Sequence, residues 1–478
     1  MFTKRPLPFL WSQLILAGLL VFILVIGDRS QPNIISVSKD VRVNEPIVVT
    51  FDRPVKREGI DELVVVSRQG QRVEGEYSWS SRSIAFIPSQ PLEHDAEYQL
   101  LVGEVRDLED HPMREPYTGV VRTSQPRFMY ISADSRLHIH NLVTQESTLL
   151  TESGKRVVDY AVSAAGTEVL YSYTLNGDSG VKYGLMYAKI KPGGSIPEQR
   201  QLYEGGEKSF GDVEICNNGL QGIAYVYQSA SDDQALVTNI AAYDFLEGGV
   251  TEKTLSLGEG EVTGKGLFCA ETSDQFMYRT LQGDVVLSAL SDTTQRTVLG
   301  RYLYTYGFAP SGEGVILGTT SPRLPSPREV FFISSSGVRR QISSNDVDTS
   351  QPAYSPDRQV LAVVEDVPKM GGGYFISSYA QVVLYKDQLG QGTLRKVMSV
   401  VSEGYSDQRP AWSRDAGYVS YERVRIDDDS QTRIQDADGS FGDGDIQLLR
   451  FDRSKSFLID TPQPVKTGVK GSRVTWLP

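Results

Sequence analysis

A short phrase recurs along this chain from Ser163 onward and limits the folds that it can adopt. The phrase has a large apolar residue and a small residue, then a turn rich in Pro, Asp, Asn or Gly, then a β-branched or aromatic run. Its clearest copies are Tyr354–Asp357 followed by Val360–Val363, and Trp412–Asp415 followed by Tyr418–Tyr421. The small residues lie at positions 163, 216, 269, 309, 355 and 413, spaced 40 to 58 apart. A period in this range is typical of propellers and solenoids.

Composition sets the outer bounds. The chain has 478 residues, 40% of them hydrophobic and 23% charged, which predicts a globular protein of more than one domain. Its net charge of −12 argues against a partner with a phosphate backbone, so we expect no nucleic-acid binding. The two cysteines, Cys216 and Cys269, take the same place in neighbouring repeats. We expect two inert buried thiols, because a disulfide needs Cα atoms within about 7 Å and innermost strands diverge around a central channel.

The N-terminal segment predicts a membrane anchor. Residues 9–27 contain only Ser12 and Gln13 as polar members, and a helix of this length reaches about 28 Å, close to the hydrocarbon thickness of a bilayer. Lys4 and Arg5 precede it, so residues 1–8 are expected in the cytoplasm and all later residues outside it. The alternative is a cleaved signal peptide, whose apolar region is usually shorter and ends in small residues.

Residues 33–124 predict a small β-sandwich of about seven short strands. The runs Phe51–Val55, Ile84–Pro88 and Glu97–Leu100, with Arg106-Asp107 before a closing Val121-Arg122-Thr123, resemble the SbsA-type bacterial Ig-like domain. The resemblance implies a spacer or adhesive module. The chain departs from the family at 107–111, where Asp-Leu-Glu-Asp-His stands in place of Asp-x-x-Gly-Asn.

Residues 127–478 resemble the TolB-type, WD-like β-propeller, most clearly at 352–364 and 409–421. The two ends of this region are complementary. Arg127–Ile131 resembles the second strand of a blade, whereas Arg473–Pro478 resembles an innermost strand with nothing after it. One composite blade and six continuous ones predict an all-β chain with a seven-bladed propeller closed by the C-terminal strand, with six or eight blades as alternatives.

One stretch offers ligands for a metal. Asp436, Asp438 and Asp443 supply hard oxygen atoms at spacings that resemble a calcium loop, although the glycine and the final glutamate of an EF-hand are misplaced. A solvated hairpin turn is the alternative for this segment. His138 and His140 alternate along a predicted strand and share one face. A zinc site is possible there, but we favour a solvent-facing stripe.

Other motifs have plainer explanations. Gly177-Asp178-Ser179-Gly180 resembles the nucleophile loop of trypsin-like proteases but stands in a predicted hairpin, so a turn is expected. Two tyrosine clusters are interpreted as core filling, with glycan or peptide binding as the alternative. Their members are Tyr171, Tyr173, Tyr183, Tyr187, Tyr302, Tyr304 and Tyr306.

The sequence favours a bacterial envelope protein, held in the cell membrane by one span, that binds a protein or glycan or acts as a scaffold. A rigid propeller with no converging catalytic set suits recognition. Two other classes stay open. One is a carbohydrate-active or other hydrolytic enzyme whose paired carboxylates lie on different blades, and the other is a structural subunit of an envelope assembly.

Overall fold

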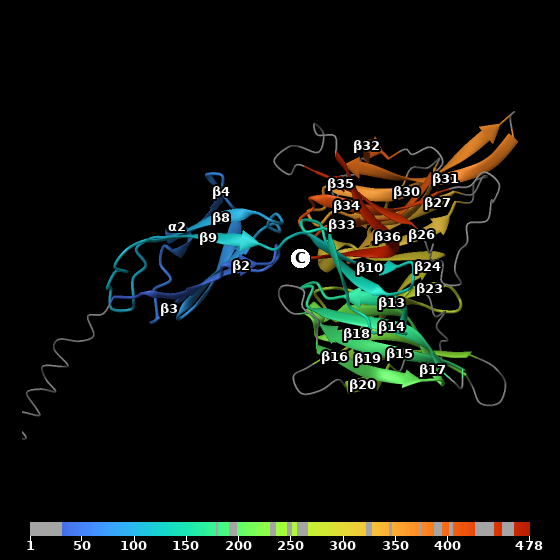
Figure 1. Cartoon of the computed structure of the whole chain (residues 1–478), viewed down its shortest axis with the longest axis horizontal. Coiled ribbons are helices and arrows are strands. Elements are labelled where there is room, and N and C mark those ends of the chain that lie inside the picture. Colours follow the sequence, from blue (N-terminus) through green and yellow to red (C-terminus); the bar gives the residue numbers. More distant parts are fainter. Residues whose placement is uncertain are drawn as a thin grey trace, which may run out of the picture. The chain divides into compact units, whose positions relative to one another are not determined.

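The computed structural model describes residues 31–478 apart from 178–179, 191–197, 230–235, 246–250, 256–265, 322–326, 344–346, 372–373, 387–393, 401–404, 426–443 and 452–462. Two compact units are present, and each is described by itself. Unit 1 comprises 1–41, 45–90 and 96–123, and unit 2 comprises 42–44, 91–95 and 124–478. Both are built of strands (Figure 1), and the described residues form one short α-helix, α2 (Ile60–Leu63). The predicted anchor at 9–27 lies outside the described residues, among which no helix is long and apolar enough to cross a bilayer.

Unit 1 consists of two sheets. The first has the order β1-β3-β7-β6 and the second the order β2-β9-β8-β4-β5. Alternate residues of β3 and β8 are buried, as expected for strands with one face on a core and the other in solvent. The bounds are β1 (Ile34–Val37), β2 (Asp40–Val41), β3 (Ile47–Phe51), β4 (Val64–Arg68), β5 (Gln71–Arg72), β6 (Gly75–Ser80), β7 (Ser83–Pro88), β8 (Glu97–Val102) and β9 (Tyr117–Thr123).

The unusual 107–111 loop of unit 1 is closed by the Asp107 side chain. Its carboxylate accepts hydrogen bonds from the backbone N–H of Glu109 and of His111, both at 2.9 Å. Burial would raise the pKa of Asp107, but these bonds and the neighbouring His111 ring hold it below its usual value. The loop therefore keeps a defined turn without the glycine that the family pattern has at this place.

The described residues of unit 2 form five consecutive four-stranded antiparallel sheets, each with its strands in chain order. This arrangement is that of propeller blades. The sheets are β13 (Arg156–Val162), β14 (Glu168–Gly177), β15 (Gly180–Lys189) and β16 (Glu198–Gly205); β17 (Lys208–Cys216), β18 (Gln221–Ser229), β19 (Leu236–Asp244) and β20 (Thr251–Thr254); β21 (Phe268–Cys269), β22 (Gln275–Arg279), β23 (Asp284–Ala289) and β24 (Arg296–Arg301); β25 (Tyr304–Phe308), β26 (Gly314–Thr320), β27 (Arg328–Ser334) and β28 (Arg339–Gln341); and β29 (Asp348–Tyr354), β30 (Val360–Gly371), β31 (Tyr374–Lys386) and β32 (Arg395–Ser399).

The sixth sheet described in unit 2 contains strands from both ends of the unit. This sheet runs β12-β11-β10-β36-β35-β34-β33 and contains β10 (Arg127–Ser132), β11 (Leu137–Asn141), β12 (Glu146–Leu149), β33 (Tyr405–Trp412), β34 (Tyr418–Arg425), β35 (Asp445–Arg450) and β36 (Gln463–Leu477). The first part of β36 pairs with β35, and its last part pairs with β10. Phe128 lies opposite Trp476, as the strand phase predicts.

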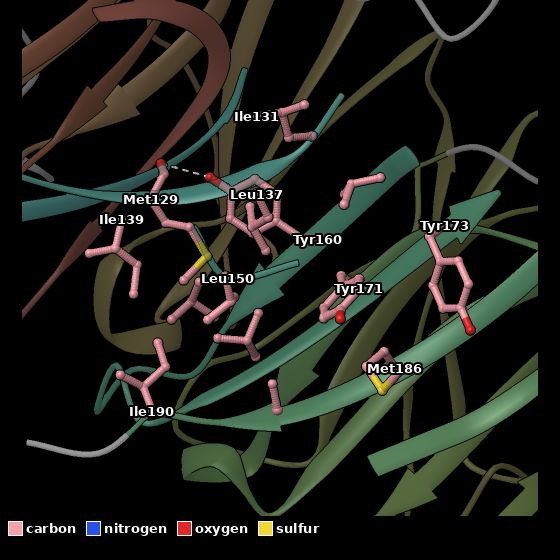
Figure 2. Close-up of a cluster of buried hydrophobic side chains, with 14 of the residues drawn as sticks. Met129, Ile131, Leu137, Ile139, Leu150, Tyr160, Tyr171, Tyr173, Met186 and Ile190 are labelled. Atoms are coloured by element: carbon pink, nitrogen blue, oxygen red, sulfur yellow. Dashed lines mark hydrogen bonds between the residues drawn. The ribbon is translucent and has the colours of Figure 1, made fainter. Parts of the chain in front are cut away.

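The cores lie between neighbouring sheets. One cluster combines Met129 and Leu137 of β10 and β11 with Tyr160, Tyr171 and Met186 of the following sheet. Figure 2 shows these side chains facing one another, with the Tyr160 hydroxyl donating to the Met129 carbonyl at 2.9 Å. The apolar face of each strand is thus covered by the next sheet, which explains why single sheets of this kind are not stable alone.

In the repeated phrase, side-chain hydrogen bonds hold the turn between the first two strands of a sheet. Ser413 Oγ donates to Asp415 Oδ1 at 2.5 Å and accepts from the Tyr418 N–H at 2.8 Å. Ser355 makes the corresponding bonds to Asp357 and the Val360 N–H, at 2.5 and 3.0 Å. Both serines are fully buried, so only a small residue fits at this position. A hydroxyl is needed there because the buried backbone N–H must have an acceptor.

The two cysteines form a disulfide, and the expectation of two free thiols is wrong. Cys216 and Cys269 are bonded, with their Cα atoms 5.5 Å apart. The residues that follow them also meet, because the N–H groups of Asn217 and Asn218 donate to the Ala270 and Glu271 carbonyls. Neighbouring first strands therefore converge at this end, where the sequence argument placed them too far apart.

Candidate functional site

The first strands of the propeller sheets share a bulge at one position. Register shifts occur between Gly211 and Glu214 in β17, between Ser350 and Ala353 in β29, and between Gln408 and Ala411 in β33. Asp212, Gln351 and Arg409, together with Arg473 of β36, have φ values of 44°, 48°, 50° and 54°. Non-glycine residues rarely adopt this left-handed conformation, so the bulges are held by surrounding bonds.

Bulge side chains bind the backbone of the next sheet. An Asp159 carboxylate oxygen accepts from the Val213 N–H at 3.0 Å, and Asp212 accepts from the Gly266 N–H at 2.6 Å. Gln351 Oε1 accepts from the Arg409 N–H at 2.6 Å. Each bond links a first strand to the neighbouring first strand or, at Gly266, to the residues just before it. Because a buried N–H without an acceptor is costly, these polar residues stabilise the packing of sheet on sheet.

Arg473 joins the last strand to β13. Its guanidinium donates to the Val158 carbonyl at 3.1 Å and forms an ion pair with Asp159. The Arg473 carbonyl also lies within hydrogen-bonding distance of the Tyr160 hydroxyl and shares its proton with the Met129 carbonyl, and the Arg473 N–H donates to the buried Glu422 carboxylate. Burial raises the pKa of Asp159 to about 6, although Arg473 acts to lower it.

We call Asp159, Asp212, Glu214 and Glu271 the carboxylate cluster. Glu214 lies two residues beyond the Asp212 bulge. Burial, together with the negative charges of Asp159, Asp212 and Glu271, raises the pKa of Glu214 well above its usual value. The cluster thus contains two carboxyls, those of Asp159 and Glu214, that are protonated more readily than an isolated glutamic acid.

Glu271 differs from Glu214 because it has a cationic partner. Arg414, in the turn after β33, forms two hydrogen bonds with Glu271, in the turn after β21, at 2.8 and 2.7 Å. Burial would raise the pKa of Glu271, but Arg414 lowers it below its usual value. The side chains are 23% and 49% exposed, so water reaches this pair and the bond adds little stability. Its effect is to hold together two turns that are 143 residues apart.

The polar residues of the first strands that link neighbouring sheets were not found from the sequence, although a signal is present. Asp159, Asp212, Gln351 and Arg409 each stand four positions before the small residue of their repeat, and Arg473 stands four before Leu477. A polar residue at a fixed place in a β-rich phrase is the pattern that marks these bulges.

The predicted calcium ligands Asp436, Asp438 and Asp443 lie outside the described residues. Within the described part of the chain, no group of three or more His, Cys, Asp or Glu residues is placed to hold a metal ion. In the protease-like motif, Gly177 and Gly180 pair at the end of the β14–β15 hairpin, while Asp178 and Ser179 are outside the described residues.

His138 and His140 do not form a solvent-facing stripe, and that expectation is wrong. His140 is buried against Phe128, with ring centroids 5.1 Å apart, and its Nδ1 is 2.9 Å from Ser147 Oγ. The half-buried His138 stacks on Tyr130 at 5.4 Å. Burial lowers the pKa of both imidazoles. The aromatic residues of β10 lie opposite the two histidines of β11. They cover the strand face that the sequence pattern predicted to be exposed to solvent.

The tyrosines mainly fill space, as expected. Tyr171 and Tyr173 are fully buried, and Tyr302 is buried as well. Tyr187 stacks on Phe245 at 4.4 Å, and Tyr304 stacks on Tyr306 at 6.3 Å. These rings pack within and between sheets.

Comparison with known proteins identifies the first unit. Residues 28–124 match the bacterial Ig-like domain family. No curated protein matches the chain in sequence. Among solved structures, it resembles the periplasmic gluconolactonase of Pseudomonas aeruginosa (12% identity, TM-score 0.43, covering 74% of this chain and 99% of that one). It also resembles TolB of Acinetobacter baumannii (8%, 0.38, covering 87% and 83%) and a putative TolB of Agrobacterium tumefaciens (13%, 0.36, covering 74% and 100%).

Proposed function

We propose that this protein binds or organises other molecules of a bacterial cell envelope, presenting a seven-bladed β-propeller on an Ig-like stalk outside the cytoplasmic membrane. The ligand class is a protein or glycan. The observation that carries this proposal is that the polar residues of the first strands form hydrogen bonds that connect neighbouring sheets. A rigid frame with broad faces suits recognition.

The blade count and the closure are part of the proposal, and strand pairing supports them. Five sheets have four strands each, and the seven-stranded sheet divides at β36 into two groups of four that share this strand. The bonds of Arg473 to Val158 and Asp159 then link the last strand to the first continuous sheet. Closure of this kind leaves no open sheet edge between the two ends.

The extracytoplasmic location is supported by the disulfide. Disulfides persist in oxidising compartments and are rare in the cytosol. The Cys216–Cys269 bond therefore agrees with export by the apolar segment at 9–27. In this arrangement the apolar segment anchors the chain, and both units lie on the outer side of the membrane.

A labelling experiment on intact cells tests the location. Cysteine placed at Ser336, an exposed turn residue, should react with a membrane-impermeant maleimide in spheroplasts. Cysteine placed at Thr3 should react only after lysis. Labelling at position 3 before lysis, or protection at position 336 until lysis, would reject the proposed orientation.

Binding is tested by cross-linking of the full chain in its native membranes. We expect one envelope component, protein or glycan, to be captured in a fixed ratio to the chain. Capture should persist in the Glu214→Gln variant, because the proposed role needs no acid–base chemistry. Absence of any fixed-ratio component would contradict the binding role.

One observation favours a second function, hydrolysis by paired carboxylates. The pKa of Glu214 is raised while that of Glu271 is lowered, and a pair displaced in opposite directions is the arrangement that acid–base catalysis uses. Against this, Glu271 is held by Arg414. Envelope glycans and esters should be assayed with the parent chain and with Glu214→Gln. Turnover that this variant abolishes, with its thermal unfolding unchanged, would establish the enzyme.

A further inference from the structure

An ion pair joins two sheets of unit 2 that are not successive. Glu271 lies in the turn after β21 and Arg414 in the turn after β33, and two hydrogen bonds of 2.8 and 2.7 Å connect them. Two complete sheets, β25 to β28 and β29 to β32, stand between these strands along the chain. The bonds of Asp212 and Gln351 connect one sheet to the next. The Glu271–Arg414 pair instead connects sheets that the chain order separates.

A second ion pair, at the same place of the repeat, joins successive sheets. Arg358, in the turn after β29, lies 2.6 Å from Glu313, in the turn after β25. Its side chains are 34% and 52% exposed, compared with 23% for Arg414 and 49% for Glu271. The two pairs share their chemistry and are similarly exposed, so a difference between their effects must come from the sheets that they connect.

The turn that carries Glu271 is also fixed to the preceding sheet. The disulfide joins the ends of β17 and β21, and beside it the Asn218 N–H donates to the Glu271 carbonyl at 2.7 Å. A Cβ atom placed at Gly219 would lie 3.1 Å from Ser163 Cβ, so the turn after β17 packs against the turn after β13. The turns after β13, β17, β21 and β33 are therefore connected to one another.

The strength of the Glu271–Arg414 pair depends on dissolved salt. Burial alone would raise the pKa of Glu271, but the charge of Arg414 lowers it, so both side chains are charged at neutral pH. Both are partly exposed, and the Debye length falls from about 10 Å at 0.1 M salt to about 3 Å at 1 M. Salt therefore weakens this contact more than it weakens the backbone hydrogen bonds of the sheets.

We propose that Glu271 and Arg414 form a salt-sensitive latch, which holds the turns after β21 and β33 together at low ionic strength and releases them as ionic strength rises. The disulfide is a positioning element of this latch, because it fixes the turn that presents Glu271. The two intervening sheets keep their own Arg358–Glu313 contact in either state. The inference does not depend on what the propeller binds or on the number of its blades.

The test is hydrogen–deuterium exchange of the full chain in detergent micelles, read by mass spectrometry between about 0.02 M and about 1 M sodium chloride. In the parent, peptides covering 270–275 and 413–418 should exchange about threefold faster at high salt, which is within what a partly exposed ion pair supplies. Arg414→Gln should exchange at the faster rate throughout, with no dependence on salt. The reversed pair, Glu271→Arg with Arg414→Glu, should restore the salt dependence.

The matched control is Arg358→Gln, which removes the pair between successive sheets. It should change exchange at 309–313 and 355–360 and leave 270–275 and 413–418 at the parental rates. Equal salt dependence in the parent and in Arg414→Gln, or no restoration by the reversed pair, would overturn the latch.

The role of the disulfide has its own readout. The variant with serine at both 216 and 269 should exchange faster at 413–418 as well as at 217–220, because the turn that presents Glu271 is no longer fixed. Faster exchange at 217–220 with parental rates at 413–418 would overturn the positioning role and leave the latch to be judged by the Arg414 variants.

Discussion

Replacing Trp476 with alanine should destabilise the propeller by about 4 kcal/mol, within the range of roughly 3–5 kcal/mol for buried aromatic residues. Trp476 is 2% exposed and lies where the last strand meets the first strand of the unit. Its ring stacks on Tyr418 at 5.4 Å and meets the edge of Phe128 at 5.6 Å. The substitution removes both contacts and leaves a cavity between β10 and β34.

The hydrogen bonds of the indole add little to this figure. Nε1 of Trp476 donates to Ser420 Oγ at 3.1 Å and to the Ala411 carbonyl at 3.2 Å. The Ser420 hydroxyl also donates to the same Ala411 carbonyl at 3.1 Å, so that carbonyl keeps a donor in the variant. The main loss is therefore aromatic packing.

The assay is urea unfolding followed by near-ultraviolet circular dichroism, with the midpoint and slope compared between variants. Trp79→Ala is the matched control, because Trp79 is 38% exposed on β6 and should cost less than about 1 kcal/mol. A loss below about 1 kcal/mol for Trp476→Ala would refute the inference that this strand pairing holds the propeller together.

Three further changes have defined outcomes. Cys216→Ser should cost about 4 kcal/mol by the loop-entropy relation, since the bond closes a loop with a sequence separation of 53; an unchanged urea midpoint, alone or with reductant added to the parent, would contradict this. Asp212→Ala should cost about 1–3 kcal/mol of stability, because it leaves the Gly266 N–H without its acceptor. Asp212→Asn should be nearly neutral, because asparagine accepts the same bond and tolerates positive φ. Equal losses of stability for both variants would contradict this role of Asp212. As the pH falls from 7 to 5, His138 and His140 should lower the free energy of unfolding, whereas the raised pKa values of Asp159 and Glu214 act in the opposite direction. Burial lowers the pKa of both histidines, so below the ordinary value of 6.5 the unfolded chain takes up protons that the folded chain resists. The variant with glutamine at both positions should lose less stability over that range, and an equal loss would exclude these histidines as the cause.

The sequence predicted the architecture well because the repeat carries phase. Phe128–Ile131 resembles the second strand of a blade that lacks its first strand. Val474–Leu477 resembles a first strand that lacks its second. Their pairing therefore follows from the sequence pattern alone. The serine and aspartate of each turn are likewise local, and their hydrogen bonds involve residues two to five positions apart.

Features that depend on how sheets converge were not predictable in this way. The distance between Cys216 and Cys269 is set by the tilt of two first strands, which a repeat position does not specify. The burial of His140 depends on the aromatic residues that β10 places against it. The carboxylate cluster joins residues from different sheets, so its raised and lowered pKa values exist only in the folded chain.

Cross-linking at Arg127 tests the closure of the propeller most directly, because this residue has a neighbour on each side. It lies opposite Leu477 on β36 and opposite Asn141 on β11. Chains with cysteines at 127 and 141 should form a disulfide through the β10–β11 hairpin whether or not the propeller is closed. Chains with cysteines at 127 and 477 should form one as well, seen as a linked peptide by mass spectrometry. A bond between 127 and 141 without one between 127 and 477 would contradict the account.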